Sequence, residues 1–293
     1  MQLFDLHCDT LYKAAMDDST LYNDAYHINI QKSQKIDTYI QMMAVWIPDG
    51  VRNESAVSLF KKCVEIYNRD RLFEDKHKFF LTVEGGSVLA GDLENIKLLT
   101  NNCVRALTLT WNNENELAFG AYSKGGLKPF GKEAVKLLQK NKIVVDISHL
   151  NEEGFYDVME IADRPIIATH SNSKSITNSP RNLTDDQFKC IIKSGGIVGL
   201  NFYKGFLNND ENKASIDDFL RHAYHFMCLS DDEHICIGSD FDGADMPDDI
   251  QGLQDIEKVY MAFCTNFGRK TADKIFFDNA NKFFTDFDNM GII

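Results

Sequence analysis

Histidine and acidic side chains recur in this chain where short apolar runs end, and the first example is His7-Cys8-Asp9. Residues two apart on an extended strand point to the same face, so we expect His7 and Asp9 to lie side by side. Cys8 is expected to face the opposite side. A neighbouring imidazole and carboxylate can bind a metal ion or share a proton, but an isolated His-x-Asp is common at protein surfaces. The pair gains meaning only if similar residues recur.

Four further residues of these types end later apolar runs. They are Glu84, His149, His170 and Asp240. A single histidine at a strand end is usually a hydrogen-bonded residue of the rim. Together with His7 and Asp9, however, the set contains three imidazoles and three carboxylates from five separate runs. Such a coincidence predicts a shared site.

The apolar runs have the composition of buried parallel strands. They are nearly continuous in apolar residues, as strands covered on both faces are. Eight are expected, at residues 3–8, 39–47, 79–84, 104–111, 143–149, 165–170, 197–203 and 235–240. Apolar residues at helical spacing lie between them, in Ser55–Phe73, Lys132–Leu138, Phe155–Ile161, Asp185–Ile192 and Asp217–Met227.

Local signals mark where two of these helices begin. Thr184 and Gln187 have the spacing of a capping box, and Asn151 can cap the helix after the fifth strand. Eight strands alternating with helices predict a (β/α)8 TIM-type barrel, formed by residues 1–293 as a single catalytic domain. No glycine-rich phosphate loop occurs, which disfavours nucleotide-binding folds. In a barrel the carboxyl ends of all strands meet at one rim, where the six residues would converge.

The remaining histidines are not expected at this rim. His222 and His225 share one face of a predicted helix without a carboxylate at ligand spacing, so we interpret them as surface or packing residues. His27, His77 and His234 lie in loops or at strand starts, which predicts the opposite end of the barrel.

Mixed imidazole and carboxylate ligands suit Zn²⁺ or a similar divalent ion. The set exceeds the three protein ligands of a usual single catalytic zinc. Two ions about 3.5–4 Å apart, bridged by one carboxylate, would use it fully. Glu84 is the expected bridge, because its strand lies between the first strand and the fifth and sixth. The sequence therefore predicts a barrel with two divalent ions, such as zinc, at its rim.

Composition limits the other classes of function. A net charge of −13 and a pI near 5.0 argue against binding to nucleic acid or to anionic membranes. No apolar run approaches the roughly 18 residues of a membrane span, and the first residues lack the pattern of a signal peptide. The seven cysteines include no CxxC pair, so we expect reduced thiols and a cytoplasmic location.

Longer stretches of the chain are similar to one known family. They are DLHCDT (5–10), VEGG (83–86), VRALTLT (104–110), GKEAVKLL (131–138), VDISHL (145–150), ATHSNS (168–173), PRNLTDDQ (180–187), GGIVGLNFY (195–203) and IGSDFDG (237–243). In content and order they resemble the membrane (renal) dipeptidase family of zinc peptidases, peptidase family M19, including its shorter bacterial members.

This resemblance implies a barrel of the metal-dependent hydrolase kind, with two zinc ions per chain, that hydrolyses dipeptides. The family's metal ligands correspond to His7 and Asp9 for one ion, His149 and His170 for the other, and Glu84 as the bridge. Asp240 corresponds to the aspartate that handles the proton, and Arg181 to an arginine on the substrate side of the pocket.

One position departs from the family pattern. Many animal members carry a histidine directly after LTLT that touches the substrate, whereas this chain has Trp111. An indole N–H can donate a hydrogen bond but cannot accept a proton or carry a positive charge. Trp111 is therefore either a substrate contact with altered chemistry or a residue that packs the rim.

The expected reaction is hydrolysis of dipeptides by a metal-bridging hydroxide, because zinc lowers the pKa of a bound water toward 7. Asp240 would take the water proton and deliver it to the leaving amine, unless it is a further metal ligand or a partner of one. Arg181 would form a two-pronged bond with the free carboxylate of the substrate, unless it belongs to a structural ion pair.

Two other functions remain open from the sequence. An N-acyl-amino-acid deacylase, or a related amidase or lactonase, would use the same metal pair, and the loops around Trp111 and Arg181 would decide. A non-catalytic barrel is supported only by the missing histidine. The expected partner is a dipeptide substrate, and a homodimer is possible because family members are often dimers.

Overall fold

The central sheet is parallel and contains seven regular strands within the residues that the computed structural model describes, 1–71 and 76–291. The strands are β1 (Gln2–Cys8), β2 (Thr38–Trp46), β3 (His77–Glu84), β4 (Ala106–Thr108), β5 (Val144–Asp146), β6 (Val198–Leu200) and β7 (Ile235–Ile237). Their order across the sheet is β5-β4-β3-β2-β1-β7-β6. All neighbouring pairs are parallel, so the carboxyl ends of the strands lie along one edge.

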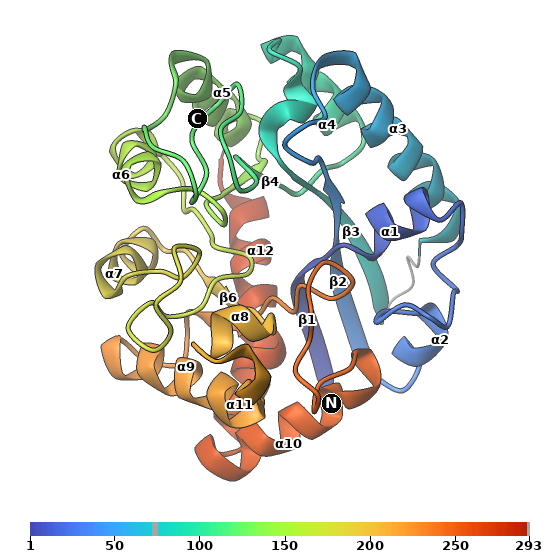
Figure 1. Ribbon diagram of the computed structural model, residues 1–293, viewed down its shortest axis with the longest axis vertical. Helices are drawn as coiled ribbons and strands as arrows, with labels where there is room; N and C mark the ends of the chain where they lie inside the picture. The colour runs from blue at the N-terminus through green and yellow to red at the C-terminus, as the bar shows by residue number, and fades with distance from the viewer. Residues whose placement is uncertain (72–75, 292–293) are drawn as a thin grey trace.

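Helices follow the strands along the chain and surround the curled sheet (Figure 1). The α-helices are α1 (Thr10–Met16), α2 (Ile30–Ser33), α3 (Asn53–Asp70), α4 (Ile96–Asn101), α5 (Pro129–Lys140), α6 (Glu152–Ile161), α7 (Asp185–Lys193), α8 (Lys204–Leu207), α9 (Ile216–Leu229), α10 (Ile256–Phe267), α11 (Arg269–Asp273) and α12 (Asn279–Asn289). Shorter helical turns are η1 (Gly86–Leu89), η2 (Leu93–Asn95), η3 (Glu211–Lys213), η4 (Leu253–Asp255) and η5 (Lys274–Asp278). The expected α/β fold with a parallel sheet is confirmed.

The strand expected at residues 165–170, the sixth of the eight along the chain, is not a regular strand. This segment forms one parallel bridge from Ile167 to Asp146 and another from Ala168 to Val198, so it meets both edge strands of the sheet. Pro165 has no amide hydrogen, and the amide of Thr169 donates to the side chain of Asp146 instead of to a neighbouring backbone. A closed eight-stranded barrel is therefore not confirmed.

Two apolar clusters cover the two faces of the curled sheet. The larger packs Leu3, Met43 and Val45 against the surrounding helices. The smaller contains Phe4 and Leu6, together with the aromatic side chains of α12, which runs through the middle of the view in Figure 1. The C-terminal helix thus closes the interior of the sheet.

A register shift in β1 decides where its polar residues point. Asp5 pairs with Gln41 and Cys8 with Met43, so β1 holds one more residue than β2 between these pairs. An extra residue of this kind interrupts the alternation of faces. As a result the sulfur of Cys8 lies 3.3 Å from that of Met43, in the larger apolar cluster and away from His7. The expectation that Cys8 faces away from its neighbours is confirmed, but simple alternation is not the reason.

The predicted helices are all present, with different ends. The capping box is formed, since Thr184 accepts from the Gln187 amide and the Gln187 side chain accepts from the Thr184 amide. Asn151 caps α6 by accepting from the amide of Gly154. The helix predicted at Ser55–Phe73 corresponds to α3, and its predicted end at Phe73 lies outside the described residues.

No described helix is long and apolar enough to cross a membrane. All seven cysteines are free thiols in the structure.

Candidate active site at the carboxyl ends of the strands

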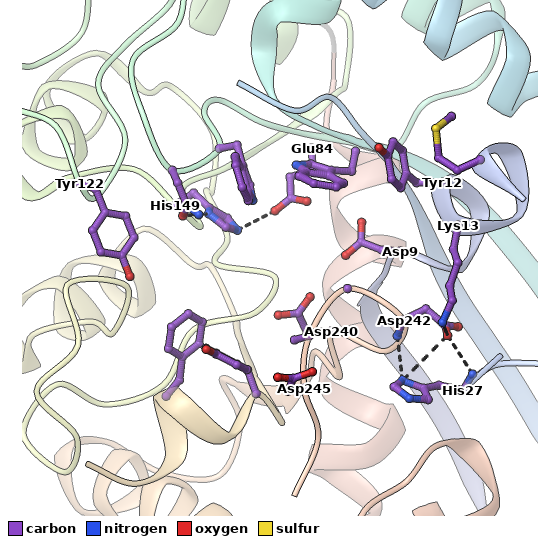
Figure 2. A pocket seen from close by; sticks show the side chains of 18 residues that line it. Asp9, Tyr12, Lys13, His27, Glu84, Tyr122, His149, Asp240, Asp242 and Asp245 are labelled. Atoms are coloured by element: carbon purple, nitrogen blue, oxygen red, sulfur yellow. Dashed lines mark hydrogen bonds and ion pairs between the residues drawn. The ribbon is translucent and has the colours of Figure 1, made fainter. Parts of the chain in front are cut away.

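A cavity of about 770 Å³ opens at the carboxyl edge of the sheet. Figure 2 shows Glu84 and His149 facing each other there, with Asp9 and Asp240 directed into the same space. Glu84 is the last residue of β3, Asp9 follows β1, and the other two lie shortly beyond β5 and β7. His170 follows the bridged residues Ile167 and Ala168 and is fully buried. The parallel strands therefore position side chains that are far apart in the sequence.

Glu84 lies between the three imidazoles. Its Oε1 is 2.6 Å from Nε2 of His149 and 3.5 Å from Nε2 of His170. Its Oε2 is 3.8 Å from Nε2 of His7. One carboxylate thus presents an oxygen to each side of the site.

His7, Asp9 and Asp240 form what we call the β1 half of the site. Nε2 of His7 is 3.4 Å from Oδ2 of Asp9 and 3.9 Å from Oδ1 of Asp240. Gly243 makes this close packing possible, because a Cβ atom there would lie 1.9 Å from Oδ2 of Asp9. Neither Nε2 of His7 nor Oδ1 of Asp9 has a hydrogen-bond partner in the described part of the chain.

His149 and His170 form the β5 half. Their Nε2 atoms face each other at 2.9 Å, whereas their Nδ1 atoms point outward. Nδ1 of His149 is 3.0 Å from Oδ1 of Asn112, and Nδ1 of His170 is 2.8 Å from Oγ1 of Thr169. An amide oxygen can only accept a hydrogen bond, so Nδ1 of His149 carries the proton. Its Nε2 then has no proton and presents a free electron pair.

This donor set fits divalent cations. Imidazole and carboxylate ligand atoms converge in one buried space, and Oδ1 of Asp9 is buried there without a partner, which a cation would correct. Two overlapping groups have ligand atoms within 4.8 Å of one another: His7, Glu84 and His170, and His7, Asp9 and Asp240. The expected division of ligands between two ions stays a prediction.

The two halves have opposite electrostatics. Burial disfavours a charge on His7, but Asp9, Glu84 and Asp240 outweigh it and raise the pKa of His7 to about 10. Burial, with Arg181 and His7 nearby, holds the pKa values of His149 and His170 well below the ordinary value. Burial also raises the pKa of Glu84 strongly and that of Asp240.

Backbone conformation at the rim is unusual in the same place. His149 and Asp240 have φ angles of 68° and 61°, in the left-handed region that non-glycine residues rarely adopt. Residues held in such conformations concentrate at functional sites, where the surrounding structure fixes them. Both side chains are thereby turned toward the cavity.

Comparisons with known proteins agree with this geometry. The family model of the membrane dipeptidases (peptidase family M19) matches residues 1–286. The chain belongs to this family. It is therefore a peptide hydrolase by family.

Individual relatives share about a third or less of their residues with this chain. A protein of Klebsiella pneumoniae, "Uncharacterized protein in pqqA 5'region", is 30% identical over 74% of this chain and 85% of its own length. An uncharacterized dipeptidase of Schizosaccharomyces pombe is 29% identical, and the match spans 74% of this chain but 56% of that protein.

Solved structures show the same fold. A metallo peptidase from Rhodobacter sphaeroides, liganded with a phosphinate mimic of the dipeptide L-Ala-D-Ala, has a TM-score of 0.89 at 24% identity, covering 97% of this chain and 99% of that one. The probable dipeptidase PvdM from Pseudomonas aeruginosa has a TM-score of 0.87 at 15% identity, with 98% and 95% covered.

Arg181, the substrate-side arginine expected in this M19 chain, is buried rather than exposed in the large cavity. Its guanidinium lies 5.3 Å from the ring of Phe206, which does line that cavity, and it borders a second cavity of about 20 Å³. Nε and Nη2 have no hydrogen-bond partner among residues 1–71 and 76–291. Burial lowers the pKa of Arg181, although Glu84 and Asp240 oppose this shift. A buried cation with free donors is suited to an anionic ligand.

Trp111 lines the cavity as part of an aromatic wall. Its ring lies 4.8 Å from that of Trp46, which in turn lies 4.7 Å from Tyr12. The Trp111 ring is also 6.3 Å from that of His149. The M19 position that departs from many animal members is thus a cavity residue.

The prediction that His27 lies at the opposite end was wrong. Its ring lines the large cavity, because the loop before α2 is anchored to Asp242 (Figure 2). Asp242 accepts from Thr10, from Lys13 and from the amide of His27, and its own amide donates to Nδ1 of His27. Four long-range bonds of this kind cannot be inferred from the sequence of the loop.

The other histidines agree with their predicted places. His222 is fully buried and accepts from the amide of Ser173, so it is a packing residue. His225 bonds Asp185 on the adjacent helix. His77 and His234 contact backbone carbonyls at the amino ends of β3 and β7.

Sequence reasoning missed two amides that hold the site. Asn112 contacts His149, and Asn201 donates from Nδ2 to Oδ2 of Asp240 at 2.9 Å. Asn201 follows β6 in the motif GLNFY, so its place at a strand end was the signal available. Asn112 directly follows Trp111.

Proposed function

We propose that this chain is a zinc-dependent dipeptidase with two ions in its site. His7 and Asp9 would hold one ion, His149 and His170 the other, and Glu84 both. When bound, zinc supplies Lewis-acid polarisation of the peptide carbonyl and makes water more acidic. The observation that carries the proposal is the convergence of five buried ligand-type side chains, with the oxygens of Glu84 facing all three imidazoles. Membership of the M19 family supports it.

The finer fold assignment is part of this proposal. Residues 165–170 would act as the sixth strand along the chain and close a (β/α)8 barrel, and residues 1–293 would form a single catalytic domain. The two bridges from this segment, one to each edge strand, support it. A homodimer and a cytoplasmic location stay predictions, which sedimentation and cell fractionation test.

Asp240 is the proposed proton carrier. Oδ2 is held by Asn201, which leaves Oδ1 on the side of His7 to take up a proton from the attacking water. Burial raises the pKa of Asp240 above its usual value, which favours a carboxyl that accepts a proton and later gives it to the leaving amine.

Arg181 is proposed to bind the free carboxylate of the dipeptide. Its unpaired Nε and Nη2 can form the two parallel bonds that a guanidinium makes with a carboxylate. Phe206, which contacts Arg181 and also lines the large cavity, would have to leave the guanidinium accessible to the substrate. Trp111 and Trp46 would contact a substrate side chain from the aromatic wall.

A substrate panel tests this function against the closest alternative. Zinc-loaded enzyme is offered dipeptides, dipeptide amides and N-acyl amino acids, and released amino acids are quantified. We expect free dipeptides to be the best substrates. Preference for N-acyl amino acids would replace the dipeptidase with a deacylase, and a chain that binds no zinc and cleaves no amide would be a non-catalytic barrel.

A further inference from the structure

We propose that Asp146, acting through Thr169, is a positioning residue that holds the His170 ring with its proton on Nδ1 and its bare electron pair on Nε2. The inference deepens the proposed function, because it treats Nε2 of His170 as the atom offered to zinc. It concerns two side chains that do not touch the cavity.

Asp146 lies fully buried at the end of β5 and is surrounded by hydrogen-bond donors. Oδ1 accepts from the amides of Ser148 and Thr169, both at 3.0 Å. Oδ2 accepts from the hydroxyls of Thr108 and Thr169, both at 2.6 Å. An ionised carboxylate has about four acceptor positions, and four donors fill them. The two backbone amides can only donate, so they favour the ionised form of this carboxylate, and the two hydroxyls complete its shell as donors.

The direction of the next bond follows from this count. The Thr169 hydroxyl has one hydrogen, and its short contact with Asp146 requires that hydrogen, because an ionised carboxylate only accepts. The Thr169 oxygen is also 2.8 Å from Nδ1 of His170. With its hydrogen committed, this oxygen can only accept there, so Nδ1 must carry the proton. Nε2, which faces His149 and Glu84, is left bare.

The partner imidazole reaches the same state by an independent route. His149 is held by the amide oxygen of Asn112, from the loop after β4. Thr169, in contrast, precedes His170 in the chain, and a threonine oxygen by itself could donate or accept. Asp146 removes that ambiguity. Outer partners of this kind orient metal-binding histidines, and their loss typically lowers metal affinity about 10–100-fold.

The test combines one change with two matched controls. Thr169→Val removes the hydroxyl while keeping the shape of the side chain, and Thr169→Ser keeps the hydroxyl. Thr108→Val removes the other hydroxyl on Asp146, which does not contact His170. Zinc affinity of each metal-depleted protein is measured by competition with a chromophoric chelator. Ring protonation is measured without metal by ¹⁵N–¹H spectra of ¹⁵N-histidine protein, with His170 assigned from His170→Gln.

We expect His170 to carry its proton on Nδ1 in wild type, Thr169→Ser and Thr108→Val, and to lose this preference in Thr169→Val. One of two zinc affinities should fall about 10–100-fold in Thr169→Val alone. A proton on Nε2 of His170 in the metal-free wild type would overturn the proposed role of Asp146 and Thr169. Equal zinc affinity of Thr169→Val and wild type would overturn it too. Tight zinc binding without cleavage of any dipeptide would instead overturn the proposed function. The spectra would still show whether Asp146 and Thr169 hold the proton on Nδ1 of His170.

Discussion

The β5 half and the β1 half of the site differ in how their imidazoles are held. In the β5 half, His149 and His170 each have an outward acceptor on Nδ1 and are kept neutral by burial. In the β1 half, His7 faces Asp9, Asp240 and Glu84, and these carboxylates raise its pKa to about 10. One half is preorganised for a cation, whereas the other holds a proton in its place.

Because of this difference, zinc binding releases a proton from an imidazole in one half of the site but not in the other. Zinc can enter the β5 half without displacing a proton from an imidazole. In the β1 half His7 must give up a proton, so binding there becomes tighter as pH rises. Glu84, which contacts both halves, is the residue through which the two are expected to depend on each other.

The largest expected effect is that of Glu84→Ala, which tests whether one residue joins the halves. We expect the affinity for both zinc ions to fall together and hydrolysis to fall to background. The reason is that no other described carboxylate faces both His7 and His149. Metal content by elemental analysis checks this. His7→Ala is the control and should empty mainly one position. Loss of a single ion in Glu84→Ala would show that the halves are separate sites.

Asp240→Asn tests whether the β1 half also carries the proton of the reaction. We expect kcat to fall about 10²–10⁴-fold with zinc content near that of wild type, since an amide cannot accept the proton. Asp245→Asn is the matched control, because Asp245 lines the same cavity but is exposed. Zinc loss in parallel with the loss of rate would make Asp240 a metal ligand instead.

Arg181→Ala tests the substrate side. We expect kcat/KM for free dipeptides to fall about 10–100-fold, which corresponds to roughly 1.5–3 kcal/mol for a charged hydrogen bond. Dipeptide amides lack the carboxylate, so wild type should cleave them poorly and the substitution should matter little. Arg181→Lys should restore only part of the loss, because an ammonium lacks the planar pair of donors. Equal losses on dipeptides and amides would assign Arg181 a structural role.

The smallest effect concerns stability of the metal-free protein, where the halves should respond to pH in opposite ways. The folded-state pKa of His7 lies above its ordinary 6.5, so its stabilising contribution is complete below about pH 6.5 and is lost as pH rises through about 10. His149 and His170 have lowered pKa values, so their contribution is lost as pH falls below 6.5.

Thermal unfolding between pH 5 and 10 checks both signs. We expect His7→Gln to flatten the alkaline decline of the metal-free protein by a few degrees in Tm, and His170→Gln to flatten the acid decline. An alkaline decline of unchanged size in His7→Gln would mean that His7 is not the group that holds the proton.

Much of this arrangement could be predicted from the order of the residues. The alternation of apolar runs and helices predicted a parallel α/β fold, because strands covered on both faces require continuous apolar sequence. Parallel strands share one carboxyl edge, so residues that end strands, such as Glu84 and Asp240, had to approach each other. Their metal and proton-transfer roles stay predictions. The capping signals at Thr184 and Asn151 were equally readable, since a cap depends on residues only three positions apart.

Other features were decided by the tertiary structure. The extra residue in β1 turns Cys8 outward, and alternation along one strand cannot reveal a shift in register against its neighbour. The segment at 165–170 loses a regular ladder because the Thr169 amide bonds Asp146, and His27 enters the cavity because Asp242 anchors its loop. The sequence by itself determined which residues end the strands. Which distant side chain completes each hydrogen bond was decided only by folding, because those partners lie tens to hundreds of residues apart in the chain.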